Sequence, residues 1–318
     1  MDLSIIIVNY NSTSYLLSCI SSIYRETKGV DFEIIVVDNA STDNGCDLIR
    51  QQYPLVKIIE SSLNLGFAGA NNIGFDQAQG EHVFFLNPDT VILENAIATL
   101  FGHLTTIKNA GAIGCRLLNS DMSIQTSALL PIPTIANQVF SLEALRTKLH
   151  RFAIFGTKPL YEKPGPPVKV PAISGACMMV RREAFKKANM FDISYFMYSE
   201  DVDLCYSMRK QGYEIYYSSD ARIVHHGGTS TKNSPIKHFN IKTMKTANYT
   251  FLKKWRGKRY ADLYKTSFAV ASCIRLFVLA CALPFSLFKG TAKNVLWSIE
   301  KWYTILTWSL SPLKRPNP

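Results

Sequence analysis

Residues 83–90 read VFFLNPDT, and this octapeptide is the best single guide to the fold. Its four leading apolar residues, aromatic and β-branched among them, predict a strand that is buried on both faces. Because proline cannot donate to a sheet ladder, Asn87-Pro88 ends the strand and leaves Asp89 at its carboxyl edge. Open α/β sheets bind ligands at that edge, where a carboxylate can hold a divalent cation and thereby a diphosphate. The alternative is that Asp89 only caps a helix beginning near Val91.

Strand and helix alternate on the amino-terminal side of this octapeptide. Buried strands are predicted at 4–9, 32–37 and 56–59. Helices are predicted between them from the helical spacing of apolar residues over 15–23 and from an N-cap at 41–43. A loop over 64–72 then enters a helix of small residues, which Gly80 ends. This order predicts a mostly parallel, Rossmann-like α/β sheet of the nucleotide-binding type, flanked by helices.

The second half of the chain is less regular. The predicted elements are a helix at 96–104, strands at 112–115, 170–180, 215–217 and 222–225, and helices opening near Arg181 and within 195–203. Between them, residues 119–170 contain six prolines and few periodic runs. A stretch of this length without clear structure is typical of a functional loop or of a partly mobile segment.

Composition narrows the class of protein. At 318 residues the chain is long enough for one large α/β domain and an appendage. A net charge of +11 favours acidic partners such as nucleotide diphosphates or anionic lipids, and no nucleic-acid motif is present, so no nucleic acid is expected. Seven scattered cysteines without CxxC spacing indicate reduced thiols in a cytosolic setting rather than a disulfide frame or a zinc site. The amino terminus lacks the basic segment of a signal peptide, so none is expected.

Polar side chains follow several of the predicted strands. Asn9 ends the first strand, and Asp38-Asn39 ends the second, where donor and acceptor groups suit a uracil or thymine edge or a ribose hydroxyl. Asp89 suits a metal ion, and the neutral imidazole of His225, which also ends a strand, is a competent second ligand. Asp38 as a turn former and His225 as a structural histidine are the alternatives.

A further acidic pair, Glu200-Asp201, opens a predicted helix. Asp201 suits a general base, because a neighbouring carboxylate raises its pKa while a helix N-terminus lowers it. The alternative is that both acids only complement the helix dipole.

Seven segments of the chain together resemble one known family. They are SIIIVNYN (4–11), EIIVVDNASTD (33–43), NLGFAGANNIG (64–74), FLNPDT (85–90), SGACMMVRREAF (174–185), FMYSEDVDLCYSMRKQGYEIYY (196–217) and HHGGTST (225–231). In this order they make the chain similar to the family 2 inverting glycosyltransferases of the GT-A fold, over about residues 1–232. Within that family the chain resembles the rhamnosyltransferase-like branch, which builds bacterial surface polysaccharides.

The resemblance implies a nucleotide site. Asp38 and Asn39 would contact the base and the ribose, and Asn9 belongs to the same set. Asn71 or Asn72 would lie along the nucleotide pocket.

The resemblance also implies a divalent cation, Mg or Mn, and a catalytic base. Asp89 stands at the metal-binding aspartate of the family's DxD motif, and His225 stands where some members place a further metal ligand. Asp201, beside Glu200, stands at the catalytic base of the ED motif. Asn87 departs from the pattern, because it replaces the first DxD aspartate and removes one anionic metal ligand; we group it with the nucleotide-binding residues.

The implied reaction is a single displacement with inversion at the anomeric carbon. The donor would be dTDP-L-rhamnose or a UDP-hexose, and the acceptor a polyprenyl-diphosphate-linked saccharide at the cytoplasmic face of the inner membrane. Two alternatives stay open. A nucleotidyltransferase would need a Gly-rich, basic signature after the first strand, which residues 10–13 lack. A non-catalytic nucleotide-binding membrane scaffold would have little use for the intact acids and histidine. The oligomeric state, a homo-oligomer included, is left open.

Residues 233–318 are predicted to form a basic, aromatic and apolar helical extension. Nine Lys/Arg and one acid lie within 237–265, and an apolar run over 268–288 precedes an aromatic one over 295–310. The length would permit a membrane span, but Arg275 in the middle of the first run is costly in hydrocarbon. Helices in the interface of an anionic membrane are therefore favoured, and a soluble appendage or a true span are the alternatives.

Overall fold

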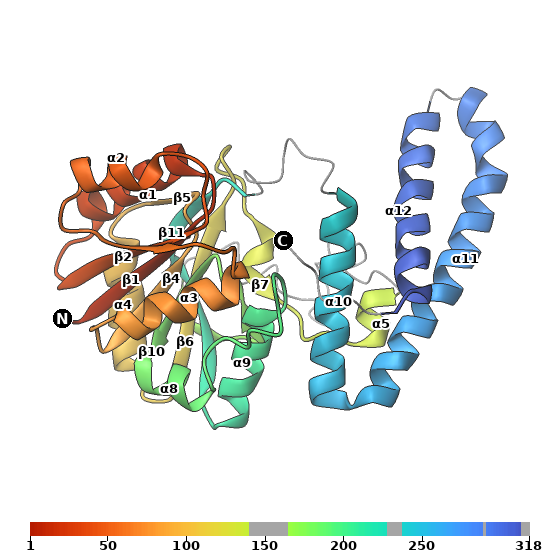
Figure 1. Ribbon diagram of the computed structural model, residues 1–318. Helices are drawn as coiled ribbons and strands as arrows, with labels where there is room; N and C mark the ends of the chain where they lie inside the picture. Colours follow the sequence, from red (N-terminus) through yellow and green to blue (C-terminus); the bar gives the residue numbers. More distant parts are fainter. Residues whose placement is uncertain (140–164, 228–236, 289–290, 313–318) are drawn as a thin grey trace.

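The computed structural model describes residues 1–139, 165–227, 237–288 and 291–312. Figure 1 shows a central sheet with helices packed around it and a group of C-terminal helices to one side. That group consists of α10 (Lys237–Arg256), α11 (Lys258–Phe288) and α12 (Ala292–Leu310). α10 lies between the sheet and the α11–α12 pair.

The main sheet has nine strands in the order β3-β2-β1-β4-β10-β6-β11-β5, with β8 also paired to β11. Their bounds are β1 Leu3–Asn9, β2 Phe32–Asn39, β3 Lys57–Ser61, β4 His82–Leu86, β5 Thr90–Ile92, β6 Ala110–Leu118, β8 Val168–Lys169, β10 Cys177–Arg181 and β11 Glu214–His225. β1 to β4 are mutually parallel, as are β6 and β11, whereas β10 runs antiparallel to both β4 and β6. The prediction of a mostly parallel sheet is therefore confirmed.

Helices connect the strands and pack on the sheet. They are α1 Thr13–Glu26, α2 Gly45–Gln52, α3 Gly66–Gln77, α4 Ala96–Thr106, α5 Ile135–Val139, α8 Arg182–Lys187 and α9 Glu200–Lys210. A 3₁₀ turn, η1, covers Thr126–Ala128, and a two-stranded sheet pairs β7 (Leu129–Leu130) with β9 (Ala172–Ile173). α3 lies close over the sheet, because a Cβ at its Gly74 would meet Ile6 Cγ2 at 2.5 Å.

Strand register brings the candidate residues to one edge of the sheet. Asn9 is paired with Asp38 at the carboxyl ends of β1 and β2. The antiparallel β10 starts at the same edge, where Cys177 is paired with Leu86 at the end of β4. β6 runs in the direction of β4, so its parallel partner β11 also ends there, at His225.

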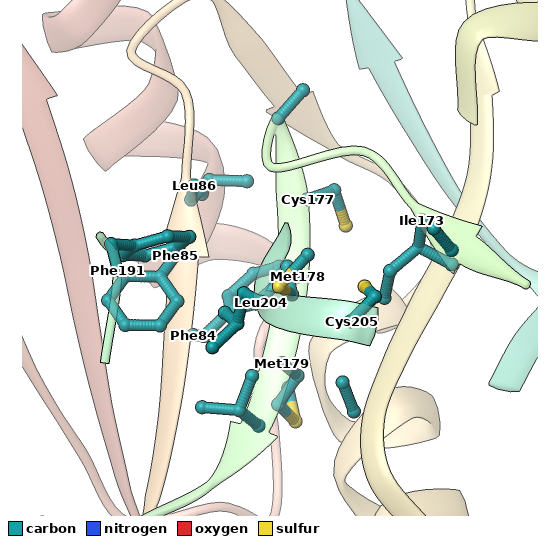
Figure 2. Close-up of a cluster of buried hydrophobic side chains, with 14 of the residues drawn as sticks. Phe84, Phe85, Leu86, Ile173, Cys177, Met178, Met179, Phe191, Leu204 and Cys205 are labelled. Atoms are coloured by element: carbon teal, nitrogen blue, oxygen red, sulfur yellow. The ribbon is translucent and has the colours of Figure 1, made fainter. Parts of the chain in front are cut away.

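The core lies between the sheet and the helices. Figure 2 shows Phe84, Phe85 and Met178 of β4 and β10 clustered with Phe191 and with Leu204 of α9. All of these residues are buried, and so is every residue of β4. A strand covered on both faces can be apolar throughout, which explains the unbroken run at 83–86.

The single strand predicted over 170–180 was wrong. β9 pairs with β7 outside the main sheet, whereas β10 lies inside it. The chain crosses between the two sheets through Ser174-Gly175-Ala176, where the Cys177 N–H donates to Ser174 O at 3.3 Å. Because the two strands belong to different sheets, the apolar run is interrupted by a turn.

A second error was to predict two strands where the structure has one. The strands predicted at 215–217 and 222–225 are one strand, β11, whose register against β6 shifts between Ser218 and Arg222. Because β6 continues along both parts, β11 absorbs the irregularity without ending.

The alternative in which Asp89 caps a helix near Val91 is wrong, since Thr90–Ile92 forms β5 against β11. The N-cap predicted at 41–43 is also wrong. The residue before α2 is Asn44, which makes no side-chain cap bond, although Asp43 Oδ1 accepts the Gly45 N–H at 3.3 Å. Residues 140–164 of the predicted long loop lie outside the described residues, as do 228–231 of the last motif.

The C-terminal extension is helical, as predicted. α11 and α12 stand side by side as a two-helix hairpin, shown in blue in Figure 1, and α10 contacts both. α11 continues through Pro284. Within the described part of the chain, α11 is the one helix that is long and apolar enough to cross a membrane.

Candidate active site

The ends of β1 and β2 form a hydrogen-bonded cluster of polar side chains. Asn9 Nδ2 donates to Asp38 Oδ1 at 3.0 Å, and the Ser41 N–H donates to the other Asp38 oxygen at 3.0 Å. Ser12 Oγ donates to Asn9 Oδ1 at 2.9 Å. Asp38 is buried, and these donors stabilise a carboxylate that would otherwise be costly to desolvate. The fold therefore brings two of the predicted nucleotide-site residues into contact.

Asn39 holds the loop that enters α3. Its Nδ2 donates to Asn64 Oδ1 at 2.9 Å, and its Oδ1 accepts the Leu65 N–H at 2.8 Å. The next residue, Gly66, has a φ of +71°, and a Cβ there would meet Phe196 O at 2.3 Å. Only glycine fits this position, so the loop ends at a defined place beside Asp38 and Asn39.

The side-chain amides of Asn71 and Asn72 form hydrogen bonds to main-chain groups of the protein. Asn71 Nδ2 donates to Phe67 O at 2.9 Å inside α3. Asn72 Nδ2 donates to Phe191 O at 2.8 Å, and its Oδ1 accepts the Phe191 N–H at 3.2 Å. Asn72 thus ties α3 to the segment that leads into α9, and contact of either residue with a nucleotide stays a prediction.

Asp89 and His225 lie next to each other, although 136 positions separate them in the sequence. His225 Nε2 is 3.3 Å from Asp89 Oδ1 and 3.2 Å from Asn87 Nδ2. The Asp89 and His225 side chains are only 8% and 13% exposed. The His226 N–H donates to Asp89 O at 2.9 Å, which fastens the end of β11 to the loop after β4.

The chemistry of this pair fits a divalent cation that also binds a diphosphate. Among the described residues no three His, Cys, Asp or Glu side chains gather as a metal cage. Mg²⁺ typically takes only one or two carboxylates from the protein and completes its shell with substrate phosphates and water. One carboxylate and one imidazole are therefore a suitable protein contribution for Mg²⁺ or Mn²⁺.

Sequence reasoning missed Gln125, which contacts the other face of His225. Gln125 Oε1 lies 2.6 Å from His225 Nδ1, and Gln125 Nε2 donates to His225 O at 3.2 Å. Gln125 falls in the proline-containing stretch that follows β6, where neither periodicity nor a motif distinguishes it. Only the tertiary fold brings it to His225.

Asp201 and Glu200 begin α9 and differ in their surroundings. Asp201 Oδ2 accepts the Gly175 N–H at 3.0 Å, and its Oδ1 accepts the Val202 N–H at 2.8 Å. Burial raises the pKa of the Asp201 carboxyl, and these two N–H donors limit the rise. Burial, reinforced by the negative charge of Asp201, raises the pKa of Glu200 well above its usual range. Glu200 Oε2 has no hydrogen-bond partner among the described residues, whereas both oxygens of Asp201 accept a main-chain N–H.

The turn between β9 and β10 connects Asp201 to the Asp89–His225 pair. The Asn87 N–H donates to Ala176 O at 3.0 Å, while the adjacent Gly175 donates its N–H to Asp201. A Cβ at Gly175 would lie 3.1 Å from the Phe67 ring and 3.5 Å from Asp201 Cβ, so the turn fits tightly. Asp89 and Asp201 are thereby held at the same edge of one rigid sheet.

α10 anchors the start of α9 from the far side. Tyr198 and Ser199 both have positive φ, 72° and 64°, which is strained for residues other than glycine. Ser199 Oγ donates to Asn248 Oδ1 of α10 at 3.0 Å. These contacts offset the strain and place the first turn of α9.

A second set of contacts joins the two helices at buried Asp203. Lys254 Nζ donates to Asp203 Oδ2 at 2.8 Å, and Trp255 Nε1 donates to Asp203 Oδ1 at 2.6 Å. Tyr195 OH also donates to Asp203 Oδ1, at 3.1 Å. α9 is therefore bound to the C-terminal extension by a charge-assisted network, which the sequence did not indicate.

Comparison with known proteins agrees with this geometry. The sequence profile described as "Glycosyl transferase family 2" matches residues 4–188. An N-acetylglucosaminyl-diphospho-decaprenol L-rhamnosyltransferase of Mycobacterium tuberculosis is 30% identical over 257 residues, covering 74% of this chain and 80% of its own length. Rhamnosyltransferase WbbL of Escherichia coli is 23% identical over 273 residues, covering 83% of this chain and 98% of its own.

Solved structures extend the likeness to the whole fold. A mannosyltransferase of Pyrobaculum calidifontis, PcManGT, in complex with GDP-Man and Mn²⁺, has a TM-score of 0.58 at 17% identity and covers 97% of this chain and 84% of that one. The profile match spans more than half of the chain, and the sheet follows the GT-A pattern. The chain belongs to glycosyl transferase family 2 and has the GT-A fold.

Proposed function

We propose that this glycosyltransferase is an inverting, metal-dependent enzyme that moves a sugar from a nucleotide diphosphate to a lipid-linked saccharide. The observation that carries the proposal is the link between Asp201 and the Asp89–His225 pair through the turn at 174–176. A base and a site for a leaving diphosphate are the two requirements of a single displacement. The names of the two relatives favour L-rhamnose as the sugar, with a UDP-hexose as the second choice.

Asp38 and Asn39 would hold the nucleotide, because they end β2 beside the loop that enters α3. Asp89 and His225 would hold Mg²⁺ or Mn²⁺, with the diphosphate as the remaining ligand. When bound, this cation neutralises negative charge on the departing diphosphate.

Asp201 would act as the general base. The acceptor hydroxyl oxygen forms a bond to the anomeric carbon while the bond from that carbon to the diphosphate oxygen breaks. The nucleoside diphosphate leaves with the electron pair, and the hydroxyl proton passes to Asp201. A carboxyl group whose pKa is raised by burial is a stronger base than an exposed one. The raised pKa of Glu200 favours a protonated Glu200 beside an ionised Asp201.

The acceptor is proposed to be polyprenyl-diphosphate-linked, and the α11–α12 hairpin is proposed to dock on an anionic membrane. The outer face of α11 carries Phe277 at 71% exposure, and α12 adds Trp297 at 48% and Tyr303 at 61%. An exposed apolar stripe with aromatic residues, preceded by the basic segment 237–265, suits the interface of an anionic bilayer.

Arg275 does not oppose this docking. Its guanidinium stacks over the Trp302 ring at 4.1 Å and its Nη2 donates to Val139 O at 3.4 Å, so the charge is turned toward the protein. The exposed apolar side chains of α11 and α12 can then contact lipid without placing the Arg275 charge in hydrocarbon. We propose on this basis a peripheral location on the cytoplasmic face of the inner membrane.

The test is a transfer assay on the full chain. Purified protein is incubated with dTDP-L-rhamnose or UDP-hexoses, Mn²⁺ or Mg²⁺, and a polyprenyl-diphosphate-linked N-acetylglucosamine acceptor, and the anomeric configuration of the product is determined. Asp201→Asn is expected to lower kcat by about 10²–10⁴-fold, the usual contribution of a general base, while dTDP or UDP still raises the melting temperature. The matched control is Asp76→Asn, on the exposed face of α3.

Near-normal turnover by Asp201→Asn would refute the assignment of the base. Nucleotide binding without transfer to any acceptor would instead favour the non-catalytic scaffold.

A further inference from the structure

We propose that Gln125 is a positioning residue that fixes the tautomer of His225, so that the Nε2 lone pair faces Asp89. The inference about metal affinity rests on the proposed function, because it concerns Asp89 and His225, the residues proposed there to hold the cation. The tautomer itself does not depend on which sugar is transferred or on whether any sugar is.

The amide of Gln125 can be oriented in only one way. Its Nε2 lies 3.0 Å from Asn119 Oδ1 and 3.2 Å from the main-chain oxygen of His225. A carbonyl oxygen only accepts hydrogen bonds, so the group facing His225 O must be the donating NH₂. The oxygen of the Gln125 amide therefore faces the His225 ring.

This orientation determines which ring nitrogen carries hydrogen. Gln125 Oε1 lies 2.6 Å from His225 Nδ1, and an amide oxygen cannot donate. The hydrogen must belong to Nδ1, which leaves Nε2 of the neutral ring as an acceptor with a free lone pair. Asn87 Nδ2, at 3.2 Å from Nε2, is a donor and is compatible with this tautomer.

The consequence is a cation site with two acceptors side by side. His225 Nε2 and Asp89 Oδ1, 3.3 Å apart, can both turn a lone pair to one ion. In the other tautomer, Nε2–H would donate to Asp89 and the imidazole would have no lone pair at this side. Histidines that bind metals are commonly oriented by an acceptor on the opposite nitrogen, which is the place of Gln125 here.

The backbone around Gln125 holds its side chain in place. The Gln125 N–H donates to Leu117 O at 2.9 Å, and the preceding turn is closed by the Asn119 N–H to Ser123 O at 2.8 Å. A Cβ at Gly227 would lie 3.4 Å from Gln125 Nε2, at van der Waals contact, so residue 227 packs beside the amide. Gln125 is therefore tied to β6, and through its amide to the end of β11.

The experiment reads the tautomer directly. The full chain, labelled with ¹⁵N-histidine and free of metal, is studied at pH 8 by two-bond ¹H–¹⁵N correlation, and His225→Gln assigns the His225 signal among the six histidines. Wild type is expected to carry the proton on Nδ1. Gln125→Met removes the acceptor, so the Nε2–H form is expected to appear.

Mn²⁺ binding is then followed by electron paramagnetic resonance in the presence of UDP or dTDP. Gln125→Met is expected to weaken Mn²⁺ binding by about 10- to 100-fold, the usual effect of losing the partner of a metal-binding histidine. The matched control is Gln79→Met, which alters an exposed glutamine distant in sequence from both loops and should change neither readout.

A wild-type proton on Nε2, or a Gln125→Met variant with unchanged tautomer and Mn²⁺ affinity, would overturn the inference. If the wild-type chain binds no Mn²⁺, both the proposed cation site and the expected effect of Gln125 on metal affinity are wrong. The position of the ring proton on His225 still tests whether Gln125 fixes the tautomer.

Discussion

The carboxyl edge of the sheet and the α11–α12 hairpin differ in which side chains they bury. The sheet edge buries polar side chains, whereas the hairpin exposes large apolar ones. At the sheet edge, Asp38, Asp89 and His225 are largely buried and hydrogen-bonded. On the hairpin, large apolar side chains such as Phe277 and Trp297 face outward. Burial of polar groups is tolerated only where partners replace water, and an extended exposed apolar face is typical of a surface that another phase or partner covers. These differences are consistent with the two ligands proposed above, a polar nucleotide at the sheet edge and an apolar membrane surface at the hairpin.

α10 connects these two regions. It contacts α11 and α12, and it holds the start of α9 through Asn248, Lys254 and Trp255. The predictions below separate the contribution of each region, beginning with the connection itself.

The largest expected effect is that of breaking the network at Asp203. Asp203→Ala removes the acceptor of Trp255 Nε1 and one of two carboxylate partners of Lys254, which keeps its contact with Asp192, and we expect the free energy of unfolding to fall by about 3 kcal/mol. This value is at the low end for a broken buried ion pair, because Lys254 is partly exposed and water can solvate it. Urea denaturation measures the change. Asp203→Asn, which keeps an oxygen for Trp255, should lose less, and an alanine variant within 0.5 kcal/mol of wild type, about the range of a neutral surface change, would contradict the prediction.

The next effect tests the hairpin. Replacing Phe277 and Trp297 by serine together should weaken binding to vesicles containing anionic lipid by about 100-fold, since each buried apolar side chain contributes roughly 1.5 kcal/mol. Vesicle sedimentation gives the partition coefficient. Leu55→Ser, which alters an 85% exposed residue just before β3, is the matched control and should bind as wild type does. Equal binding by the double variant would exclude this face as the membrane contact.

A smaller effect is expected at the sheet edge. Asn87→Asp replaces the amide donor near His225 Nε2 with a carboxylate, so Mn²⁺ should bind about tenfold more tightly in the presence of UDP. Isothermal titration of Mn²⁺ checks this. Unchanged affinity would mean that position 87 does not face the ion.

The subtlest test concerns pH. Because burial raises the pKa of Glu200 above its unfolded value, the native state binds a proton that the unfolded chain has released. The stability that this proton contributes is fully present below the unfolded pKa and is lost as pH rises through the folded pKa. The free energy of unfolding should therefore fall with increasing pH above about 4.5, and Glu200→Gln should flatten that slope. Parallel pH profiles for wild type and variant would argue against a neutral Glu200.

Much of the sheet could be predicted because its signals are local. The runs at 5–8, 34–37 and 83–86 are apolar without interruption, and a strand covered on both faces tolerates that pattern. The errors at 170–180 and at β11 arose where pairing partners decide the outcome. An apolar run does not reveal that its two halves join different sheets, nor that a register shift leaves a strand unbroken.

The site residues likewise comprise some that local motifs predicted and others that only the fold revealed. Asp89, Asp201 and His225 were identified from motifs, and the fold brings Asp89 into contact with His225 and links Asp201 to the same edge. Gln125 and Asn248 were not identified. They lie 100 and 49 positions from the residues they hold, in segments where any polar residue would satisfy the local pattern.

The sequence by itself determined the mostly parallel sheet, the family, and the residue types at the strand ends, because apolar periodicity and short motifs are properties of neighbouring residues. The tertiary structure decided how His225 is oriented, that Asp201 accepts two main-chain N–H groups while Glu200 Oε2 has no partner among the described residues, and that α10 holds the start of α9. These properties depend on burial and on hydrogen-bond partners from distant segments, and only the packed fold brings such partners within about 3 Å of each other.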